Sequence, residues 1–155
     1  MSLGVVAALV LLLVALAAQS RSMSVTLGIT DGRLRACPAT PNCVSSDAPE
    51  GDSHHIAPIA DPTGEKWATL VATVSAMTGA SLVDFDESYA HFTFTSNIIR
   101  FVDDVEFHYR PDVGEIAIRS ASRVGRGDWN ANRNRAEAVR ALLEDANRSD
   151  LIGHE

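Results

Sequence analysis

Two cysteines in a short, proline-containing loop are the residues of this chain whose types and spacing say most about chemistry. Cys37 and Cys43 are its only cysteines, and Pro38 and Pro41 lie between them. A zinc site usually takes four ligands from closely spaced pairs, and a thioredoxin-like redox site needs two cysteines separated by two residues. The observed spacing fits neither. It predicts a structural disulfide, which requires an oxidising compartment such as the bacterial periplasm.

Asp103 is the candidate for a buried charge. It lies in an alternating segment where it would share one strand face with apolar side chains, while Asp104 would lie on the other face. A buried carboxylate must be ion-paired or hydrogen-bonded. The available cations are Arg119, Arg123 and Arg133. We expect a structural polar cluster. The alternatives are a pocket for an anionic or polar ligand, a catalytic carboxylate, or, if the strand contains a bulge, the same role for Asp104.

Other polar residues are assigned local roles. Asn42, Ser45 and Ser46 belong to the cysteine loop, and no Gly-x-Ser-x-Gly turn of a hydrolase nucleophile surrounds the serines, so we expect them to cap the loop. Asn132 interrupts an apolar stripe of the last predicted helix. We expect it to hydrogen-bond the backbone of the cysteine loop and so to connect the loop with that helix.

The sequence contains no pattern that predicts a cofactor or a metal site. His54 and His55 have no carboxylates at ligand spacing, and the chain has neither a Walker loop nor a glycine-rich dinucleotide fingerprint. His91 and His108 fall on predicted strands, where we expect them to face solvent. The net charge of −7 argues against nucleic-acid binding, which normally requires a basic face.

The elements that position these residues follow from hydrophobic periodicity. Apolar residues at helical spacing predict a helix over Glu65–Met77, ended by Gly79. Alternating apolar and polar residues then predict four antiparallel strands with one solvated face. These strands are Ser81–Asp86, Tyr89–Ser96, Ile99–Tyr109 and Glu115–Val124.

A second helix is predicted over Trp129–Asn147, with Asp128 as its N-cap. Its buried stripe consists of Trp129, Asn132, Ala136, Val139, Leu142, Leu143 and Ala146. The predicted fold class is therefore α+β: a four-stranded antiparallel sheet with both helices on its apolar face, in the order α-β-β-β-β-α.

An apolar N-terminus and a long irregular arm precede these elements. Leu3–Ala18 is apolar throughout, and neither Lys nor Arg precedes it. It is either a signal peptide cleaved near Ala15-Leu16-Ala17 or an uncleaved membrane anchor of about the minimum bilayer length, and we expect the anchor, although Arg21 weakly favours a cytoplasmic domain. A start at Met23 would remove the segment altogether. The predicted organisation is a signal or anchor over 1–22, an irregular arm over 23–62, an α+β domain over 63–148 and a frayed tail over 149–155.

A set of short motifs occurs in a characteristic order along the chain. They are Leu27–Leu34, Cys37-Pro38, Pro41–Ser46, His55-Ile56, Arg100–Phe107, Ile118–Gly125 and Asn132–Arg135. Together they resemble the domain-of-unknown-function family 1499, although Arg126–Trp129 departs from the aromatic residue or Ser that often follows Val-Gly there. Members of that family are mostly bacterial, so the resemblance implies a bacterial protein with an N-terminal signal or membrane segment. It implies a compartment and a fold class but no reaction.

Two function hypotheses follow. In the first, the protein is a non-enzymatic domain anchored in the bacterial inner membrane and facing the periplasm, an accessory or structural subunit whose partners are the membrane and integral membrane proteins. In the alternative, it is a small-molecule or lipid-binding periplasmic domain, or an enzyme of unknown type, built on Asp103 and the arginines; cleavage of the N-terminus would make it soluble. A sealed, fully paired polar cluster favours the first hypothesis, and an open cleft with an unpaired Asp103 favours the second.

Overall fold

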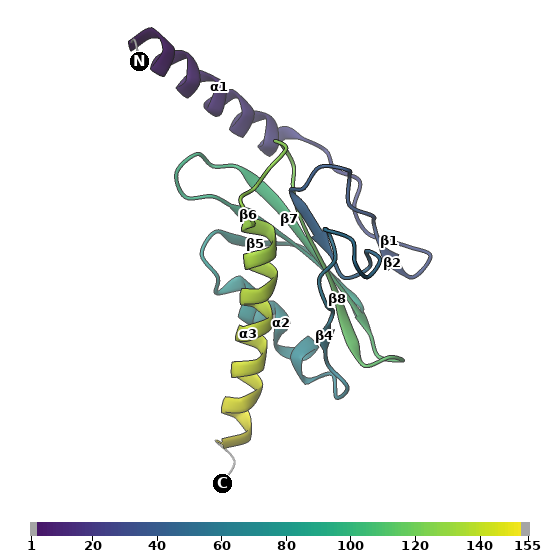
Figure 1. Cartoon of the computed structure of the whole chain (residues 1–155). Helices are drawn as coiled ribbons and strands as arrows, with labels where there is room; N and C mark the ends of the chain where they lie inside the picture. The colour runs from purple at the N-terminus through teal and green to yellow at the C-terminus, as the bar shows by residue number, and fades with distance from the viewer. Residues whose placement is uncertain (1–2, 153–155) are drawn as a thin grey trace.

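The computed structural model describes residues 3–152, with side chains at all of these positions except 147 and 149–152. An antiparallel sheet has two helices on one face and the N-terminal arm on the other (Figure 1). A long apolar helix, α1 (Leu3–Ser22), projects from one end of this body. The α+β class is as predicted.

The main sheet has six strands rather than the four predicted. Their order is β3-β8-β7-β6-β5, with β4 also paired to β8, and all of these pairings are antiparallel. The arm supplies β3 and β4, which are three and two residues long and therefore too short for alternation to reveal. The six strands are β3 (Cys43–Ser45), β4 (Ile59–Ala60), β5 (Ala80–Phe85), β6 (Tyr89–Thr95), β7 (Val102–Arg110) and β8 (Glu115–Ser122).

The central strand β7 begins at Val102 rather than at Ile99. The residues before it belong to the β6–β7 loop, in which Arg100 has a φ of 69°. From Asp103 on, β7 is in unbroken register with both neighbouring strands. Asp103 and Asp104 therefore lie on opposite faces of the sheet, as predicted.

Both helices pack on one face of the sheet, as predicted, and we call it the helix-covered face. α2 (Glu65–Ser75) and α3 (Ala131–Ile152) contact each other and the apolar side chains of the central strands. Large buried side chains of this core include Ile59, Trp67, Leu70, Phe92, Phe94, Phe107, Ile116, Ile118 and Leu143.

The start of α3 differs from the prediction. Trp129 was expected in the buried stripe, but it precedes the helix with a φ of 51° and is 98% exposed. Leu142 is exposed as well. Asp128 nevertheless acts as the expected cap, because its carboxylate accepts hydrogen bonds from the backbone N–H groups of Asn130 and Asn132 at 3.2 and 2.9 Å.

The end of α3 lies beyond the predicted position. The helix continues to Ile152, through most of the segment that the sequence analysis assigns to a frayed tail. Positions 153–155 of that segment lie outside the described residues.

The second face of the sheet was predicted to be solvated, but the arm covers it, and we call it the arm-covered face. β1 (Ile29–Thr30) and β2 (Arg33–Leu34) form a hairpin whose Leu34 is buried against the sheet. His91, expected in solvent, is only 8% exposed, and Glu106 is fully buried. Polar side chains on this face are therefore interior side chains.

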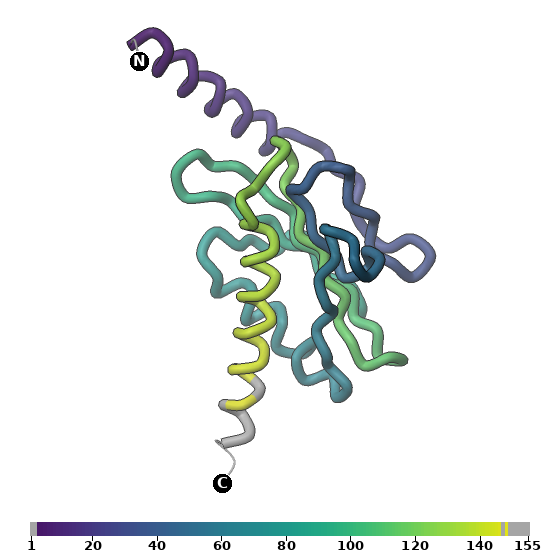
Figure 2. The backbone as a smooth tube through the Cα atoms, viewed as in Figure 1, coloured from purple at the N-terminus to yellow at the C-terminus, as the bar shows by residue number. Residues whose placement is uncertain are grey.

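α1 leaves the body beside the β6–β7 and β8–α3 loops, at the end where α3 begins (Figure 2). Its last turns are part of the fold: Ala17 and Ser20 are buried, and Ser20 Oγ accepts a hydrogen bond from the Val102 N–H at 3.2 Å. The helix is long and apolar enough to cross a membrane by length and composition, criteria that a signal sequence also meets.

Candidate functional site

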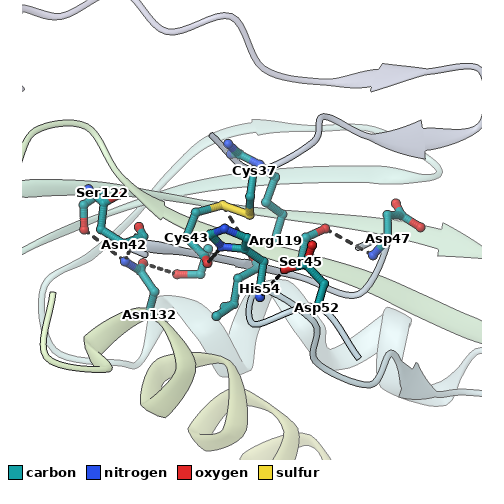
Figure 3. Close-up of a disulfide and its surroundings, with 12 residues drawn as sticks. Cys37, Asn42, Cys43, Ser45, Asp47, Asp52, His54, Arg119, Ser122 and Asn132 are labelled. Atoms are coloured by element: carbon teal, nitrogen blue, oxygen red, sulfur yellow. Dashed lines mark hydrogen bonds between the residues drawn. A yellow bond between two sulfur atoms is a disulfide. The ribbon is translucent and has the colours of Figure 1, made fainter. Parts of the chain in front are cut away.

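Cys37 and Cys43 form the predicted disulfide, with Cα atoms 5.7 Å apart. Cys43 is the first residue of β3 and pairs with Ala121 of β8. His54 Nδ1 lies 2.8 Å from the carbonyl oxygen of Cys43, and Arg119 lies beside the disulfide (Figure 3). The bridge therefore fixes an edge of the main sheet, where the arm enters it.

Asn132 connects the cysteine loop with α3, as predicted. Its Nδ2 donates hydrogen bonds to the carbonyl oxygen of Asn42 at 3.0 Å and to Ser122 Oγ at 2.9 Å (Figure 3). Its Oδ1 accepts a hydrogen bond from the Ser120 hydroxyl at 2.6 Å. Asn132 is fully buried, and hydrogen bonds to the residues that it connects satisfy the polar groups of its side chain.

The other loop residues named from the sequence also bind backbone. Ser45 Oγ accepts a hydrogen bond from the Asp47 N–H at 3.1 Å, and Ser46 Oγ accepts one from the Ile118 N–H at 2.9 Å. Asn42 donates from Nδ2 to the carbonyl oxygen of Gly125 at 3.0 Å. The Ser46 and Asn42 side chains therefore join the loop to β8 and to the segment that follows it, and the Ser45 side chain caps the loop itself.

Asp103 pairs with an arginine that was not among the three cations expected near it. Its Oδ2 accepts a hydrogen bond from Arg135 Nη2 at 2.6 Å, and the Arg135 guanidinium lies 4.8 Å from the centre of the Phe94 ring. A cation at that distance interacts favourably with the ring face. Asp103 is therefore ion-paired between β7 and α3, but it is partly exposed beside a pocket rather than buried as expected.

The three arginines expected near Asp103 lie elsewhere. Arg119 and Arg123 point to the arm-covered face, because they alternate with the residues of β8 that face the helices. Arg133 turns toward the arm and donates to the carbonyl oxygens of Ser53 and His55 at 2.8 and 2.9 Å. It holds the arm on α3 through backbone groups.

Glu106 and Arg119 form one ion pair of the arm-covered face, with Arg119 Nη1 donating to Glu106 Oε2 at 2.9 Å. The other carboxylate oxygen accepts hydrogen bonds from the Tyr89 hydroxyl at 2.8 Å and from the Gly28 N–H at 2.7 Å. Burial, followed by the charge of Glu106, raises the pKa of the Tyr89 hydroxyl, which keeps it a donor. Glu106 thus connects the arm with three strands of the sheet.

Asp104 and Arg123 form the second ion pair of this face. Arg123 donates from Nη2 and Nε to the two carboxylate oxygens at 2.7 and 2.8 Å, and His91 Nε2 lies 2.8 Å from Oδ1. Burial opposes ionisation of Asp104, but the hydrogen bonds from Arg123 and His91 outweigh it and lower the pKa of the carboxyl group. Arg123 Nη1 also donates to the carbonyl oxygen of Ser20, so this pair reaches α1.

Glu106 was not among the residues singled out from the sequence, and Asp104 was considered only as an alternative to Asp103, although a signal for both pairs exists. Asp104 and Glu106 are two residues apart on one predicted strand, and Arg119 and Arg123 are four apart on the next, so each set lies on a single face. The β7–β8 pairing places Glu106 directly opposite Arg119. Opposite charges at even spacing on two consecutive strands indicate such a pairing. His108 on the same face, also expected in solvent, is partly buried.

A pocket of about 300 Å³ lies where α1 meets the rest of the protein. Leu16 of α1 lines it together with Phe101, and its charged lining consists of Asp103, Asp128 and Arg135. Asp103 and Arg135 are paired with each other, and Asp128 caps α3. The charged groups of the pocket are therefore already engaged within the fold.

The connections between arm, sheet and α3 are made by residues of the motifs seen in the sequence, and a family comparison covers the same region. The model of the family described as "Protein of unknown function (DUF1499)" matches residues 33–143. The chain belongs to the DUF1499 family. Searches of curated proteins and of solved structures each gave no significant match.

In this DUF1499 protein, the matched region contains the disulfide and the Glu106–Arg119 and Asp104–Arg123 ion pairs, and it begins after α1. Among the side chains that the structure describes, no group of three or more His, Cys, Asp or Glu residues is placed to hold a metal ion. The charges of Asp103, Asp104 and Glu106 are each compensated by an arginine. Such an arrangement can fix the arm and the base of α1 on the sheet.

Proposed function

We propose that this DUF1499 protein is a non-enzymatic domain that α1 anchors in the bacterial inner membrane, facing the periplasm, where it is an accessory subunit of a larger integral membrane complex. The observation that carries the proposal is the closed state of the polar clusters. Asp103, Asp104 and Glu106 are all ion-paired inside the fold. Charged side chains that are paired in this way hold segments of the chain to one another.

Retention of α1 as an anchor is supported by its contacts with the domain. Ala17 and Ser20 are buried, and Leu16 lines the pocket at the base of the helix. Cleavage within the last turns of α1 would remove packing that the folded domain makes. The periplasmic side is supported by the disulfide, which persists in oxidising compartments.

Assembly with other membrane subunits is supported by the composition of α1. Gly4 and Ala8 are four residues apart, so they lie on one face of the helix, and a Cβ added at Gly4 would meet no atom within 4 Å. Small residues at this spacing allow two membrane helices to approach closely. This face is where we place the contact with a partner helix.

The test is extraction of the full chain from membranes in mild detergent, followed by intact-mass measurement and native gel electrophoresis. We expect a mass that retains residues 1–22 and a species larger than the monomer that contains an integral membrane protein in fixed ratio. Gly4→Leu combined with Ala8→Leu should dissociate that species. Val6→Leu, an enlargement on another face of α1, is the matched control and should leave it intact.

Two outcomes would overturn parts of the proposal. A mature mass that lacks residues 1–17 or 1–18 would show a soluble periplasmic protein and remove the anchor. Migration as a monomer with α1 retained would remove the accessory-subunit role and keep the anchor.

A second candidate function is binding of a small amphipathic or lipid molecule, and the pocket beside Leu16 favours it. The molecule would contact Leu16 and Phe101 and approach the Asp103–Arg135 pair. Mass spectrometry of solvent extracts of the purified protein tests this candidate. Ala131→Phe should fill the pocket and remove a bound molecule, whereas Ala131→Ser should retain it; extracts that contain no such molecule in the unaltered protein would reject the candidate.

A further inference from the structure

We infer that the β6–β7 and β8–α3 loops lie in the lipid headgroup region of the bilayer and that Ile98 and Trp129, one in each loop, insert into it as apolar anchors. This inference rests on the proposed anchoring by α1 and adds an orientation of the domain on the membrane. It makes the end of the domain beside α1 a lipid-binding surface.

The first step is the packing of α1 on the domain. Leu13, Leu16, Ala17 and Ser20 are the residues of its last turns that are shielded from solvent, and they lie on one face of the helix. The Arg21 side chain donates to the carbonyl oxygen of Arg100 in the β6–β7 loop at 3.3 Å. The loops therefore flank the helix itself and not only the chain that follows it (Figure 1).

The second step is depth. The apolar stretch that ends at Ala18 contains 16 residues from Leu3 on, about 24 Å of helix, which is no more than the hydrocarbon thickness of a bilayer. None of this stretch can be withdrawn from the membrane without shortening the span further. Leu16 must therefore lie close to the hydrocarbon boundary, and the loop residues that line the same pocket, including Phe101 and Gly125, lie at the same level.

The third step is the composition of the two loops. Ile98 is 93% exposed and Trp129 is 98% exposed, which makes them the most exposed large apolar side chains of the described chain. Trp is enriched at membrane–water interfaces, where its ring is partly in apolar and partly in wet surroundings. In water, this exposure would cost free energy without any return from packing.

The fourth step is charge. The exposed charged side chains of the two loops and of the last turn of α1 are Arg21, Arg100 and Arg126, all positive, in a chain of net charge −7. A basic rim around exposed apolar side chains is complementary to anionic lipid headgroups. A lipid surface is favoured over a protein partner because the two apolar side chains come from separate loops beside α1. Both loops therefore lie where α1 enters the bilayer.

The test uses the full chain reconstituted into vesicles of phosphatidylcholine and phosphatidylglycerol. Trp67→Phe leaves Trp129 as the only tryptophan, and its fluorescence is measured in vesicles whose lipids are brominated either near the headgroup end of the acyl chain or near the methyl end. We expect strong quenching by the first lipid, weaker quenching by the second, and protection from aqueous acrylamide. Trp129→Phe, which leaves the buried Trp67 on α2, a helix that lies away from α1 (Figure 1), is the matched control and should be quenched by neither lipid. If Trp67→Phe fails to fold, the difference between the unaltered chain and Trp129→Phe gives the same readout.

The outcomes separate this inference from the proposed function. A chain that does not float with the vesicles would overturn the anchoring by α1. A chain that floats, but whose Trp129 is quenched by acrylamide and by neither brominated lipid, would overturn the inference and leave the anchor. Protection of Trp129 from acrylamide in native membranes but not in vesicles would assign the surface to a protein partner and would also overturn it.

Discussion

The two faces of the main sheet are buried by opposite means. On the helix-covered face, the central strands present apolar side chains such as Phe92 and Phe107, whose rings pack edge to face at 6.1 Å. On the arm-covered face, the positions between them carry Asp104, Glu106 and Arg119, each no more than 6% exposed. Dispersion and the hydrophobic effect stabilise the first face, and charge-assisted hydrogen bonds stabilise the second.

The comparison shows that equal burial does not mean equal sensitivity. An apolar core loses stability in proportion to the volume that a substitution removes. A buried ion pair contributes little net stability while it is intact, but removal of one partner leaves a charge that the interior cannot solvate. We therefore expect the most sensitive single positions on the arm-covered face.

Arg119→Met should cause the largest loss of stability. It leaves the fully buried Glu106 carboxylate with hydrogen bonds from Tyr89 and Gly28 but without its cation. The expected loss is about 3–5 kcal/mol in the free energy of unfolding. Urea unfolding of the full chain in mild detergent measures it.

Two controls decide whether charge is the cause. Glu106→Gln added to Arg119→Met should recover part of the loss, because no ionised group then remains. Ile118→Val, at the adjacent position on the helix-covered face, should cost about 0.5–1.5 kcal/mol. If Arg119→Met costs no more than Ile118→Val, the two faces do not differ as described.

Asp104→Asn should have the next largest effect, about 1.5–3 kcal/mol at neutral pH, because it weakens hydrogen bonds from Arg123 and His91. The same substitution at Asp103, on the helix-covered face, is the matched control. It should cost less, since Asp103 has one ion-pair partner and its side chain is more exposed.

The pH dependence provides a second measurement at Asp104. Because folding lowers the pKa of this carboxyl group below its ordinary 3.8, its contribution is fully present above that value and is lost as the pH falls through the lower, folded-state pKa. The unaltered protein should therefore lose stability below about pH 4, and Asp104→Asn should show a shallower decline. Equal acid slopes would contradict the assigned ion pair.

The helix-covered face was predictable from sequence because its periodicity is that of a one-sided core. Phe92, Val105, Phe107 and Leu143 each fall where the alternation or the helical stripe puts them. The disulfide and the contact between Asn132 and the cysteine loop were predictable too, since few partners exist for two lone cysteines or for a polar residue in an apolar stripe.

The arm-covered face was not predictable in the same way. An alternating strand has the same polar residues whether water or another segment of the chain covers them. His91 was therefore expected in solvent, and Glu106 fell on the face that was expected to be solvated, yet both are buried. The strands β3 and β4 have too few residues for a period. Trp129 was predicted to be in the core because it matches the helical spacing of the apolar stripe. Its positive φ is not helical, so it lies outside α3 and outside the stripe.

Cys37→Ser combined with Cys43→Ser should cost about 2 kcal/mol, because opening a loop this small restores little chain entropy to the unfolded state. The bridge lies at the edge where the arm enters the sheet, so its loss should be felt on the arm-covered face first. Thermal unfolding with and without a reductant measures the effect. A melting temperature that does not respond to reduction would show that the hydrogen bonds of β3 and its loop hold this edge without the bridge.

Glu137→Ala should have the smallest effect, within about 0.5 kcal/mol, because its ion pair with Arg140 is exposed to water and screened by salt. Arg140→Ala removes the same pair but should cost more. The Arg140 guanidinium also donates to the carbonyl oxygens of Pro58 and Ala57, both at 2.6 Å, and so holds the arm on α3. Urea unfolding of both variants at low and high salt separates the two contributions, since only the ion pair should weaken with salt. Equal costs for the two variants would mean that the arm contributes nothing at this contact. A larger cost for Arg140→Ala would show that an arginine stabilises this protein by the backbone groups it binds, even where its ion pair contributes almost nothing.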